Sequence, residues 1–386
     1  MAEHTPLAQR AGLYLHVPFC QRKCPYCGFS SRPPRDGDFA CYFKAVLAQL
    51  HTVARLPEIR ELRFASVFFG GGTPSLLPAG MLASLLHACT AALNCAADRE
   101  ISVEVNPGTI GAPALQVLRK AGFNRLSVGV QSFCDAELRR LGRIHSAAEA
   151  GKAVAMARAA GFANISLDLM YGLPGQSAAD WQHSLEAALA LEPQHLALYE
   201  LTPEAGTPLA AALERGAIRL PEEDEVLAMM AITRRLMAGT ALARYEISNY
   251  ARPGLQCRHN LNYWENGFYL GLGPGAVSAF GGGRFAIPPG LTRYRERAAS
   301  GQPAWDAGER LDREAAFRET VIMGLRMIRG ISAAALQRRF ALDLRRYYGP
   351  VLERLLAQKL VVWHGDLLAL SDSGLLLANQ VMAELV

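Results

Sequence analysis

Three cysteines near the start of the chain have the spacing of metal ligands. They lie in the segment Cys20-Gln-Arg-Lys-Cys24-Pro-Tyr-Cys27, whereas the other five cysteines are scattered. A structural zinc ion takes four protein ligands, and the nearest further candidate, His16, is expected inside a strand. Three thiolates suit a 4Fe-4S cluster better, because cysteinates hold such clusters and a missing fourth ligand leaves one iron open. We therefore predict a cluster at Cys20, Cys24 and Cys27, with a cofactor or substrate on the open iron.

A second set of candidate residues follows short apolar runs that read as strands. Glycines let a backbone approach a ligand closely, and carboxylates at strand ends can bind hydroxyl groups and positive charge. Five such ends carry polar or glycine residues, and the cysteine segment follows a sixth, the end of the first strand. The five are Gly70-Gly71-Gly72-Thr73, Glu104 with Asn106, Gln131 with Ser132, Asp168, and Glu200 with Thr202. If the strands are parallel, these residues meet at one edge and form a site.

The elements that must position them alternate about six times between strand and helix. Strands are expected at Leu13 to Val17, Ser66 to Phe69, Ile101 to Val105, Arg125 to Val130, Asn164 to Met170 and His195 to Leu201. Helices are expected at Phe39 to Val53, Met81 to Leu93, Ala112 to Ala121, Ala147 to Ala160 and Asp180 to Leu191. An open doubly wound sheet binds ligands at one switch point, whereas a barrel gathers every strand end at one mouth. The pattern favours an α/β fold with a partial (β/α)6 TIM-type barrel.

The composition changes near residue 240 and again near residue 313, which divides the chain into three expected parts. Residues 1–240 form the barrel, residues 241–312 a glycine- and aromatic-rich extension and linker that packs on it, and residues 313–386 a small C-terminal domain. The stretch from Gly281 to Asp306 is expected to be a linker. The last part is mostly helical and resembles a winged helix, with helices at Glu314 to Met327, Ser332 to Phe340 and Pro350 to Gln358 and a hairpin from Leu360 to Leu370.

Composition narrows the class of protein. Of 386 residues, 51% are hydrophobic and 19% charged, which excludes a disordered chain, and the net charge of +5 is too small to argue for nucleic-acid binding. The segment from Met1 to Arg10 has no apolar stretch typical of a signal peptide, and no run of 18 apolar residues occurs. We expect a cytoplasmic protein without a membrane anchor. Peripheral association with a membrane and the oligomeric state stay open.

The order of these motifs resembles the radical S-adenosylmethionine (SAM) superfamily. The resemblance rests on the C-x3-C-x2-C cluster with an aromatic residue before its last cysteine, followed by Gly70-Gly-Gly-Thr-Pro74 and a strand that ends in glutamate. It implies that the open iron binds the amino and carboxylate groups of SAM, and that one electron cleaves the sulfonium to a 5'-deoxyadenosyl radical.

Further motifs are similar to the oxygen-independent coproporphyrinogen III oxidase family, over nearly the whole chain. They include Tyr14-Leu-His-Val-Pro-Phe-Cys20, Glu104-Val-Asn-Pro107, Ser127-Val-Gly-Val-Gln-Ser132, Leu141-Gly-Arg-Ile-His-Ser146, Asp168-Leu-Met-Tyr-Gly-Leu-Pro174 and Tyr245-Glu-Ile-Ser-Asn249. By this resemblance the residues that contact SAM are Tyr14, Gly71, Gly72, Thr73, Glu104, Gln131, Arg143 and Asp168.

Within that family the chain resembles the HemW-type haem chaperone branch more than the oxidase. The oxidase extends its cluster motif as Cys-x-Cys, but here Phe29 takes the place of that cysteine, and only 19 residues precede Cys20. The segment Cys257-Arg-His259-Asn260-Leu-Asn-Tyr263-Trp264 resembles the His-Asn-x-x-Tyr-Trp signature of the chaperones. This branch implies a haem-binding protein that passes haem to acceptor proteins, with His259 as the candidate haem ligand.

One position departs from the chaperone pattern. Relatives read Gly-x-Gly-Ala-His-Ser after that signature, whereas this chain has Val277 in place of the histidine, which puts haem handling in doubt. The alternative is an enzyme that decarboxylates or otherwise modifies a tetrapyrrole, and the sequence names no catalytic side chain for it.

Overall fold

The computed structural model describes residues 9–386, so most of the segment examined for a signal peptide lies outside the described part. Six parallel strands lie side by side in the order of the sequence. All six expected strands are present, some of them longer than expected: β1 (Gln9–Val17), β2 (Leu62–Gly71), β3 (Cys95–Val105), β4 (Arg125–Gln131), β5 (Ile165–Tyr171) and β6 (His195–Glu200). Their apolar runs are buried on both faces, as parallel strands require.

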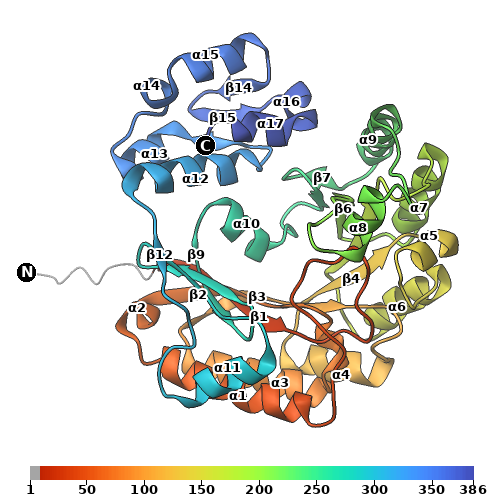
Figure 1. The fold of residues 1–386 in the computed structure, drawn as a ribbon, viewed down its shortest axis with the longest axis vertical. Helices are drawn as coiled ribbons and strands as arrows, with labels where there is room; N and C mark the ends of the chain where they lie inside the picture. The colour runs from red at the N-terminus through yellow and green to blue at the C-terminus, as the bar shows by residue number, and fades with distance from the viewer. Residues whose placement is uncertain (1–8) are drawn as a thin grey trace, which may run out of the picture.

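Helices between the strands cover the outer face of this sheet (Figure 1). The capping boxes Ser146–Glu149 and Ser177–Asp180 define where two of them begin, and Gly122 ends a third in the left-handed conformation, at φ 109°. The five expected helices are confirmed as α1 (Asp38–Val53), α3 (Ala79–Ala92), α4 (Ala112–Ala121), α6 (Ala147–Ala159) and α7 (Ala178–Ala190). Shorter elements join them: α2 (Pro57–Arg60), the 3-10 turn η1 (Pro74–Leu76) and α5 (Asp135–Arg140).

The extension adds strands to both edges of the six-stranded sheet. On the β6 edge lie β8 (Asn249–Ala251) and β7 (Ala243–Arg244), which follow α8 (Pro208–Glu214) and α9 (Glu223–Ala238). On the β1 edge lie β9 (Phe268–Leu272), β10 (Val277–Phe280), β11 (Gly283–Ala286) and β12 (Glu309–Arg310). The result is a twelve-stranded sheet in which β1 and β6 do not pair, so the barrel is partial, as expected.

The expected linker from Gly281 to Asp306 is wrong in part, because the segment holds β11 and a helix, α11 (Leu291–Ala299). Leu291, Tyr294 and Ala298 of this helix are buried in the main core. Tyr294 also donates a 2.5 Å hydrogen bond to the buried Gln49 of α1. The apolar residues are few and stand among arginines and glycines, so the segment reads as polar although one face of its helix is buried.

The C-terminal part has its own core and a three-stranded antiparallel sheet. Phe317 lies at the centre of that core, edge-on to Phe340 and Tyr347. The expected helices and hairpin are present, and α14 was not expected. The elements are α12 (Arg313–Leu325), β13 (Ile331–Ser332), α13 (Ala333–Phe340), α14 (Leu344–Tyr348), α15 (Pro350–Ala357), β14 (Val361–His364), β15 (Leu367–Leu370), α16 (Asp372–Leu376) and α17 (Ala378–Ala383).

A short helix, α10 (Arg258–Trp264), lies between the sheet and the C-terminal domain (Figure 1). The guanidinium of Arg326, at the end of α12, stacks on the ring of Trp264 at 4.2 Å and lies 3.8 Å from the fully buried carboxylate of Glu246. Through Arg326 the C-terminal domain thus contacts both α10 and the segment that carries Glu246. In the described residues no helix is both long and apolar enough to cross a membrane.

Candidate cofactor site

The loop after β1 carries the three cysteines and closes on itself. The amide of Cys20 donates to the carbonyl of Arg32 at 3.1 Å, and the amide of Arg32 donates back to Pro18 at 3.0 Å. Phe19 is fully buried between the rings of Phe39 and Tyr42 and anchors the start of the loop. The cysteines therefore project from a loop whose two ends are fixed to the barrel.

All three cysteines line one cavity of about 670 Å³ at the carboxyl ends of the parallel strands. Each is a free thiol and is partly buried. No three His, Cys, Asp or Glu side chains of residues 9–386 are close enough to hold a single ion. A cluster attaches each cysteinate to a different iron, so thiols spread around a cavity fit a 4Fe-4S cluster better than one zinc ion.

The glycines of the β2 end are required by the closeness of β1. At Gly71, φ is 111°, and an added Cβ would lie 2.6 Å from the ring of His16. At Gly72 an added Cβ would lie 2.5 Å from the carbonyl oxygen of Phe19. The amide of Thr73 donates to that same carbonyl at 2.7 Å. Only glycine lets the two strand ends approach so closely and leaves their backbone facing the cavity.

A hydrogen-bonded chain of side chains connects two cysteines across the cavity wall. The hydroxyl of Thr73 lies 3.7 Å from the sulfur of Cys20 and accepts from Asn106 Nδ2 at 2.8 Å. Arg143 donates to Asn106 Oδ1 and to a backbone carbonyl, both at 2.7 Å, and its other nitrogen lies 3.9 Å from the sulfur of Cys24. The guanidinium charge therefore lies beside a thiol that must ionise to bind iron.

Gln131 reaches the cavity through an unusual backbone conformation. Its φ is 68°, a left-handed value that non-glycine residues seldom adopt. The register between β4 and β5 shifts between Gly129 and Gln131, and such an irregularity redirects a side chain at a strand end. The residue lines the same cavity as the cysteines.

Two buried carboxyl groups, Glu104 and Asp168, separate this cavity from a smaller one. Burial raises the pKa of Glu104 to about 8, the charge of Asp168 adds to the effect, and the amide of Gly71, which donates to Glu104 at 3.1 Å, opposes it. Burial also raises the pKa of Asp168, against the positive charge of Arg125 and hydrogen bonds from Ser166 and Ser127. At neutral pH Glu104 therefore keeps its proton, while it is positioned to accept or release one.

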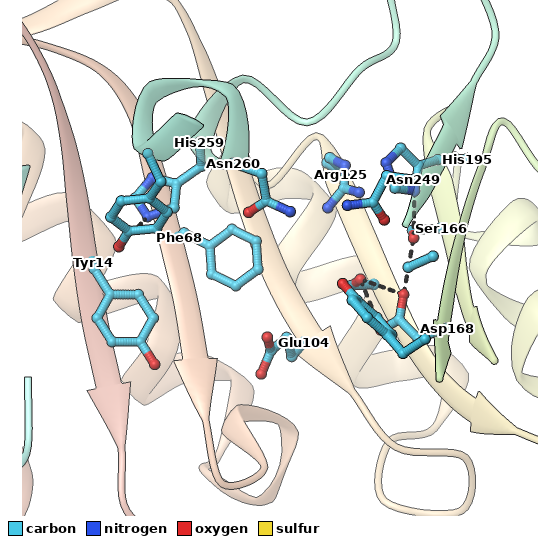
Figure 2. Close-up of a pocket in the computed structure, with 14 residues that line it drawn as sticks. Tyr14, Phe68, Glu104, Arg125, Ser166, Asp168, His195, Asn249, His259 and Asn260 are labelled. Atoms are coloured by element: carbon cyan, nitrogen blue, oxygen red, sulfur yellow. Dashed lines mark hydrogen bonds between the residues drawn. The ribbon is translucent and has the colours of Figure 1, made fainter. Parts of the chain in front are cut away.

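The smaller cavity, which we call the inner chamber, has a volume of about 260 Å³ and is shown in Figure 2. It shares Glu104, Asp168, Ser127 and Tyr199 with the outer cavity. Of the expected SAM contacts, Gly71, Gly72, Thr73, Glu104, Gln131, Arg143 and Asp168 line the outer cavity with the cysteines. Tyr14 does not, because it lines the inner chamber and its hydroxyl lies 3.1 Å from His16 Nδ1.

His259 also lies in the wall of the inner chamber, only 1% exposed. Its Nδ1 lies 2.9 Å from the hydroxyl of Ser66, and its Nε2 lies 3.1 Å from the hydroxyl of Tyr263. Burial, with a further contribution from the charge of Arg125, lowers the pKa of His259 to about 3, so the ring is neutral. Both nitrogens are thus engaged, and haem ligation by His259, which stays a prediction, would require one of these bonds to break.

Several polar residues of the inner chamber were not expected from the sequence: Arg125, Ser166, His195, Asn249 and Asn260. Ser166 and His195 lie inside apolar strand segments and form one chain, in which Ser166 donates to Asp168 at 3.0 Å and lies 2.8 Å from His195 Nδ1. For Arg125, Ser166 and His195 the available signal was a charged or polar residue inside a run expected to be buried on both faces. Asn249 and Asn260 stood in motifs quoted for the family resemblance. Phe29, at the position of the oxidase's extra cysteine, is 65% exposed and lines the outer cavity.

Known proteins are similar to this chain over most of its length. Residues 14–188 match the family model described as the radical SAM superfamily, and residues 311–377 match the HemN C-terminal domain. The chain is 34% identical to "Heme chaperone HemW" of Bacillus subtilis, covering 95% of this chain and 97% of that protein. It is 35% identical to the protein of the same name from Mycobacterium tuberculosis, covering 98% and 95%.

Two further proteins are similar to this chain, one over part of its length and one over nearly all of it. The bovine protein "Radical S-adenosyl methionine domain-containing protein 1, mitochondrial" is 39% identical over 76% of this chain, and the match spans 64% of the bovine protein. Among solved structures, coproporphyrinogen III oxidase (HemN) from Escherichia coli superposes with a TM-score of 0.84 at 25% identity, covering 99% of this chain and 91% of that one.

Proposed function

Because this chain belongs to the HemW family of radical SAM proteins, we propose that it holds a 4Fe-4S cluster and SAM in the outer cavity and binds haem for transfer to acceptor proteins. The observation that carries the proposal is the gathering of three free cysteines, two glycines with tight backbone packing and two buried carboxyl groups around one cavity. The relatives at 34% and 35% identity are named heme chaperones and are matched over nearly their whole length.

In this proposal Cys20, Cys24 and Cys27 hold three irons of the cluster. The nearby guanidinium of Arg143 favours the thiolate form of Cys24, because a positive charge stabilises an adjacent anion. A cluster held there would supply an electron for chemistry at the sulfonium of SAM.

Gly71, Gly72, Gln131 and Asp168 all border the cavity in which we place SAM. Glu104 is protonated at neutral pH when no ligand is present. A cationic ligand favours its ionised form, so binding of SAM would release the proton from Glu104. Because binding releases a proton, the affinity for SAM should rise as the pH rises.

The haem part of the proposal has a structural requirement. The inner chamber, with a volume of about 260 Å³, is smaller than cavities that hold drug-sized ligands. The porphyrin therefore cannot lie within it. For His259 to bind iron, one of its ring nitrogens must lose its hydroxyl partner: Ser66 of β2 if α10 shifts, or Tyr263 of the same helix if that side chain turns away. The N-terminus of α10 is held by the carboxylate of Glu100, which accepts from the amides of residues 258 and 259 at 3.1 and 3.3 Å.

The test is a haem titration of anaerobically reconstituted protein, followed by transfer to apomyoglobin as a model acceptor. We expect a Soret band in the wild type that is lost or shifted in His259→Ala and is retained in Cys257→Ala. An unchanged spectrum in His259→Ala would remove the ligand assignment. If the wild type binds no haem, the chaperone proposal is refuted.

A parallel incubation addresses the enzymatic alternative, with which the overall likeness to the oxidase structure is consistent. The reduced protein is given SAM and coproporphyrinogen III, and the products are separated by chromatography. We expect no protoporphyrinogen, because Phe29 stands where the oxidase has a cysteine. Multiple turnovers to protoporphyrinogen would instead support the oxidase activity.

A further inference from the structure

The inner chamber contains a buried cation that the described chain leaves without a partner. Arg125, the first residue of β4, is 2% exposed. Its Nε has no hydrogen-bond partner among residues 9–386, and the ion pairs found in that range do not include it. A guanidinium has five N–H donors and keeps its charge inside proteins. Buried charges are ordinarily paired, so this side chain has a strong capacity to bind an acceptor.

The two nearby carboxyl groups use their oxygens elsewhere. Glu100 accepts from the thiol of Cys257 and from two backbone amides at the start of α10. Asp168 accepts from the hydroxyls of two serines, at distances of 3.0 and 3.1 Å. Their charges favour the presence of a cation, but neither group forms a hydrogen bond or an ion pair with Arg125. The donors of the guanidinium thus remain available to a ligand.

Two side-chain amides accompany Arg125 in the chamber wall. Asn249 is 1% exposed and lines the chamber, where its Nδ2 can donate to an acceptor, whereas its Oδ1, without a partner in the described part of the chain, accepts only. Asn260 lines the same chamber. Figure 2 shows Arg125 between these two amides at one end of the chamber, with Glu104 and Asp168 at the other. A ligand group placed there meets a cation, two amides and, beyond them, the boundary with the outer cavity.

We propose that the inner chamber binds a carboxylate group, which Arg125 holds through its N–H donors and the amides of Asn249 and Asn260 flank. A guanidinium and a carboxylate match in shape and form two parallel charge-assisted hydrogen bonds. The ligand enters from the outer cavity, since the two spaces adjoin at Glu104 and Asp168. Its carboxylate therefore lies on the far side of these acids from the cysteines.

The size and charge of the chamber favour a carboxylate over other anions. A volume of about 260 Å³ accommodates a short acid side chain and excludes a nucleotide. Asp168 and Glu100 are already close to Arg125, so a dianion such as phosphate would meet more repulsion than a monovalent carboxylate. Two sources share this chemistry: a propionate side chain of haem and a small free organic acid.

The first arm of the test uses propionate and its neutral isostere propionamide, measured by ligand-observed NMR on cluster-loaded protein. We expect wild type to prefer propionate, and Arg125→Gln to bind propionate at least about tenfold more weakly while propionamide changes little. The matched control is Arg60→Gln, which removes an exposed arginine of α2 and should behave as wild type. Equal propionate affinity in wild type and Arg125→Gln, or no propionate binding by wild type, would overturn the proposal.

The second arm distinguishes the two sources by titrating haem and haem dimethyl ester, which lacks free carboxylates. If haem binding weakens about tenfold in Arg125→Gln and ester binding does not, the ligand group is a haem propionate. If only propionate binding responds, the ligand is a small free acid. If wild type binds no haem but propionate still requires Arg125, the chaperone proposal fails and the carboxylate site stands.

A variant that retains the charge guards against misfolding of Arg125→Gln. Arg125→Lys keeps a cation but loses the planar pair of donors, so we expect weaker propionate binding with a smaller loss than in Arg125→Gln. Iron content and thermal unfolding show whether each variant is folded. Should Arg125→Gln fail to fold, propionate affinity in a folded Arg125→Lys that equals wild type would overturn the proposal.

Discussion

The buried carboxyl of Glu104 gives a pH dependence of stability that one substitution should remove. In the cluster-free protein its pKa is about 8, compared with an ordinary value of 4.5, and burial is the largest cause. The folded protein therefore keeps a proton that the unfolded chain has lost above pH 4.5. Because the folded state binds more protons between pH 4.5 and 8, this group lowers the free energy of unfolding as the pH rises through that range, and the loss is complete above pH 8.

The size of this change in the free energy of unfolding follows from the pKa difference between the folded and unfolded states, at about 1.36 kcal/mol per pH unit. Between pH 4.5 and pH 7 the accumulated loss is about 3 kcal/mol. Glutamine cannot ionise, and its side-chain oxygen can still accept from the amide of Gly71, as Glu104 does at 3.1 Å. Glu104→Gln should therefore match wild type near pH 4.5 and exceed its stability by about 3 kcal/mol at pH 7.

The assay is urea unfolding of cluster-free protein at several pH values from 5 to 8, followed by fluorescence. Trp181 is fully buried in the barrel and reports on that domain. Glu353→Gln, which removes an exposed glutamate of α15, serves as the matched control and should keep the wild-type pH dependence. The reasoning is refuted if Glu104→Gln and wild type lose stability in parallel as the pH rises.

Four further outcomes are expected. Cys24→Ser should lose iron and the visible absorbance of the cluster, because a hydroxyl is a poor substitute for a thiolate, and full iron content on metal analysis would contradict the cluster assignment. The affinity of cluster-loaded wild type for SAM should rise from pH 6 to 8 in calorimetry, since binding releases the Glu104 proton, and Glu104→Gln should bind more weakly without this slope. Gly71→Ala should lower stability by about 2 kcal/mol or more in thermal unfolding, because φ is 111° and the added methyl would meet His16, and an unchanged Tm would contradict the close packing. Phe317→Ala should destabilise the C-terminal domain by about 3 to 5 kcal/mol in denaturant unfolding, and a loss below 1 kcal/mol would contradict its central place in that core.

Local patterns were sufficient for the six parallel strands and for the cysteine loop. Strands such as β4 are short apolar runs bounded by turn residues, and helices such as α6 begin with a capping box, so nearest neighbours in the sequence specify them. Local patterns did not predict helix α11, because Tyr294 is buried by contact with the distant Gln49 rather than by a local apolar pattern. The strands of the extension likewise became visible only through their pairing with β1 and β6.

Most of the candidate SAM residues could be placed from the sequence, and the position of one of them, Tyr14, depends on tertiary structure. The glycines and acids after the strands could be named because parallel strand ends meet at one edge, and the structure brings them to one cavity. The side chain of Tyr14 lines the inner chamber instead. Alternate residues of a strand face opposite sides of the sheet, and the position along β1 decides which cavity a side chain reaches. Asn106 was visible as a strand-end residue, but its link between Thr73 and Arg143 depends on the ends of β2 and β3 and on the loop between α5 and α6.

The sequence by itself determined the ligand chemistry of this protein: three cysteines at fixed spacing, glycines where a backbone must approach closely, and carboxyl groups at the ends of apolar strands. Tertiary structure decided which of these groups share a cavity and in which protonation state. Burial of Glu104 raises its pKa, while burial and two hydroxyl contacts leave His259 neutral and engaged. Arg125 shows the difference most plainly, because a charged residue in an apolar run becomes a binding group only when β3, β5 and α10 surround it. Local sequence specifies which donors and acceptors exist, but their solvation and partners come from segments far apart along the chain.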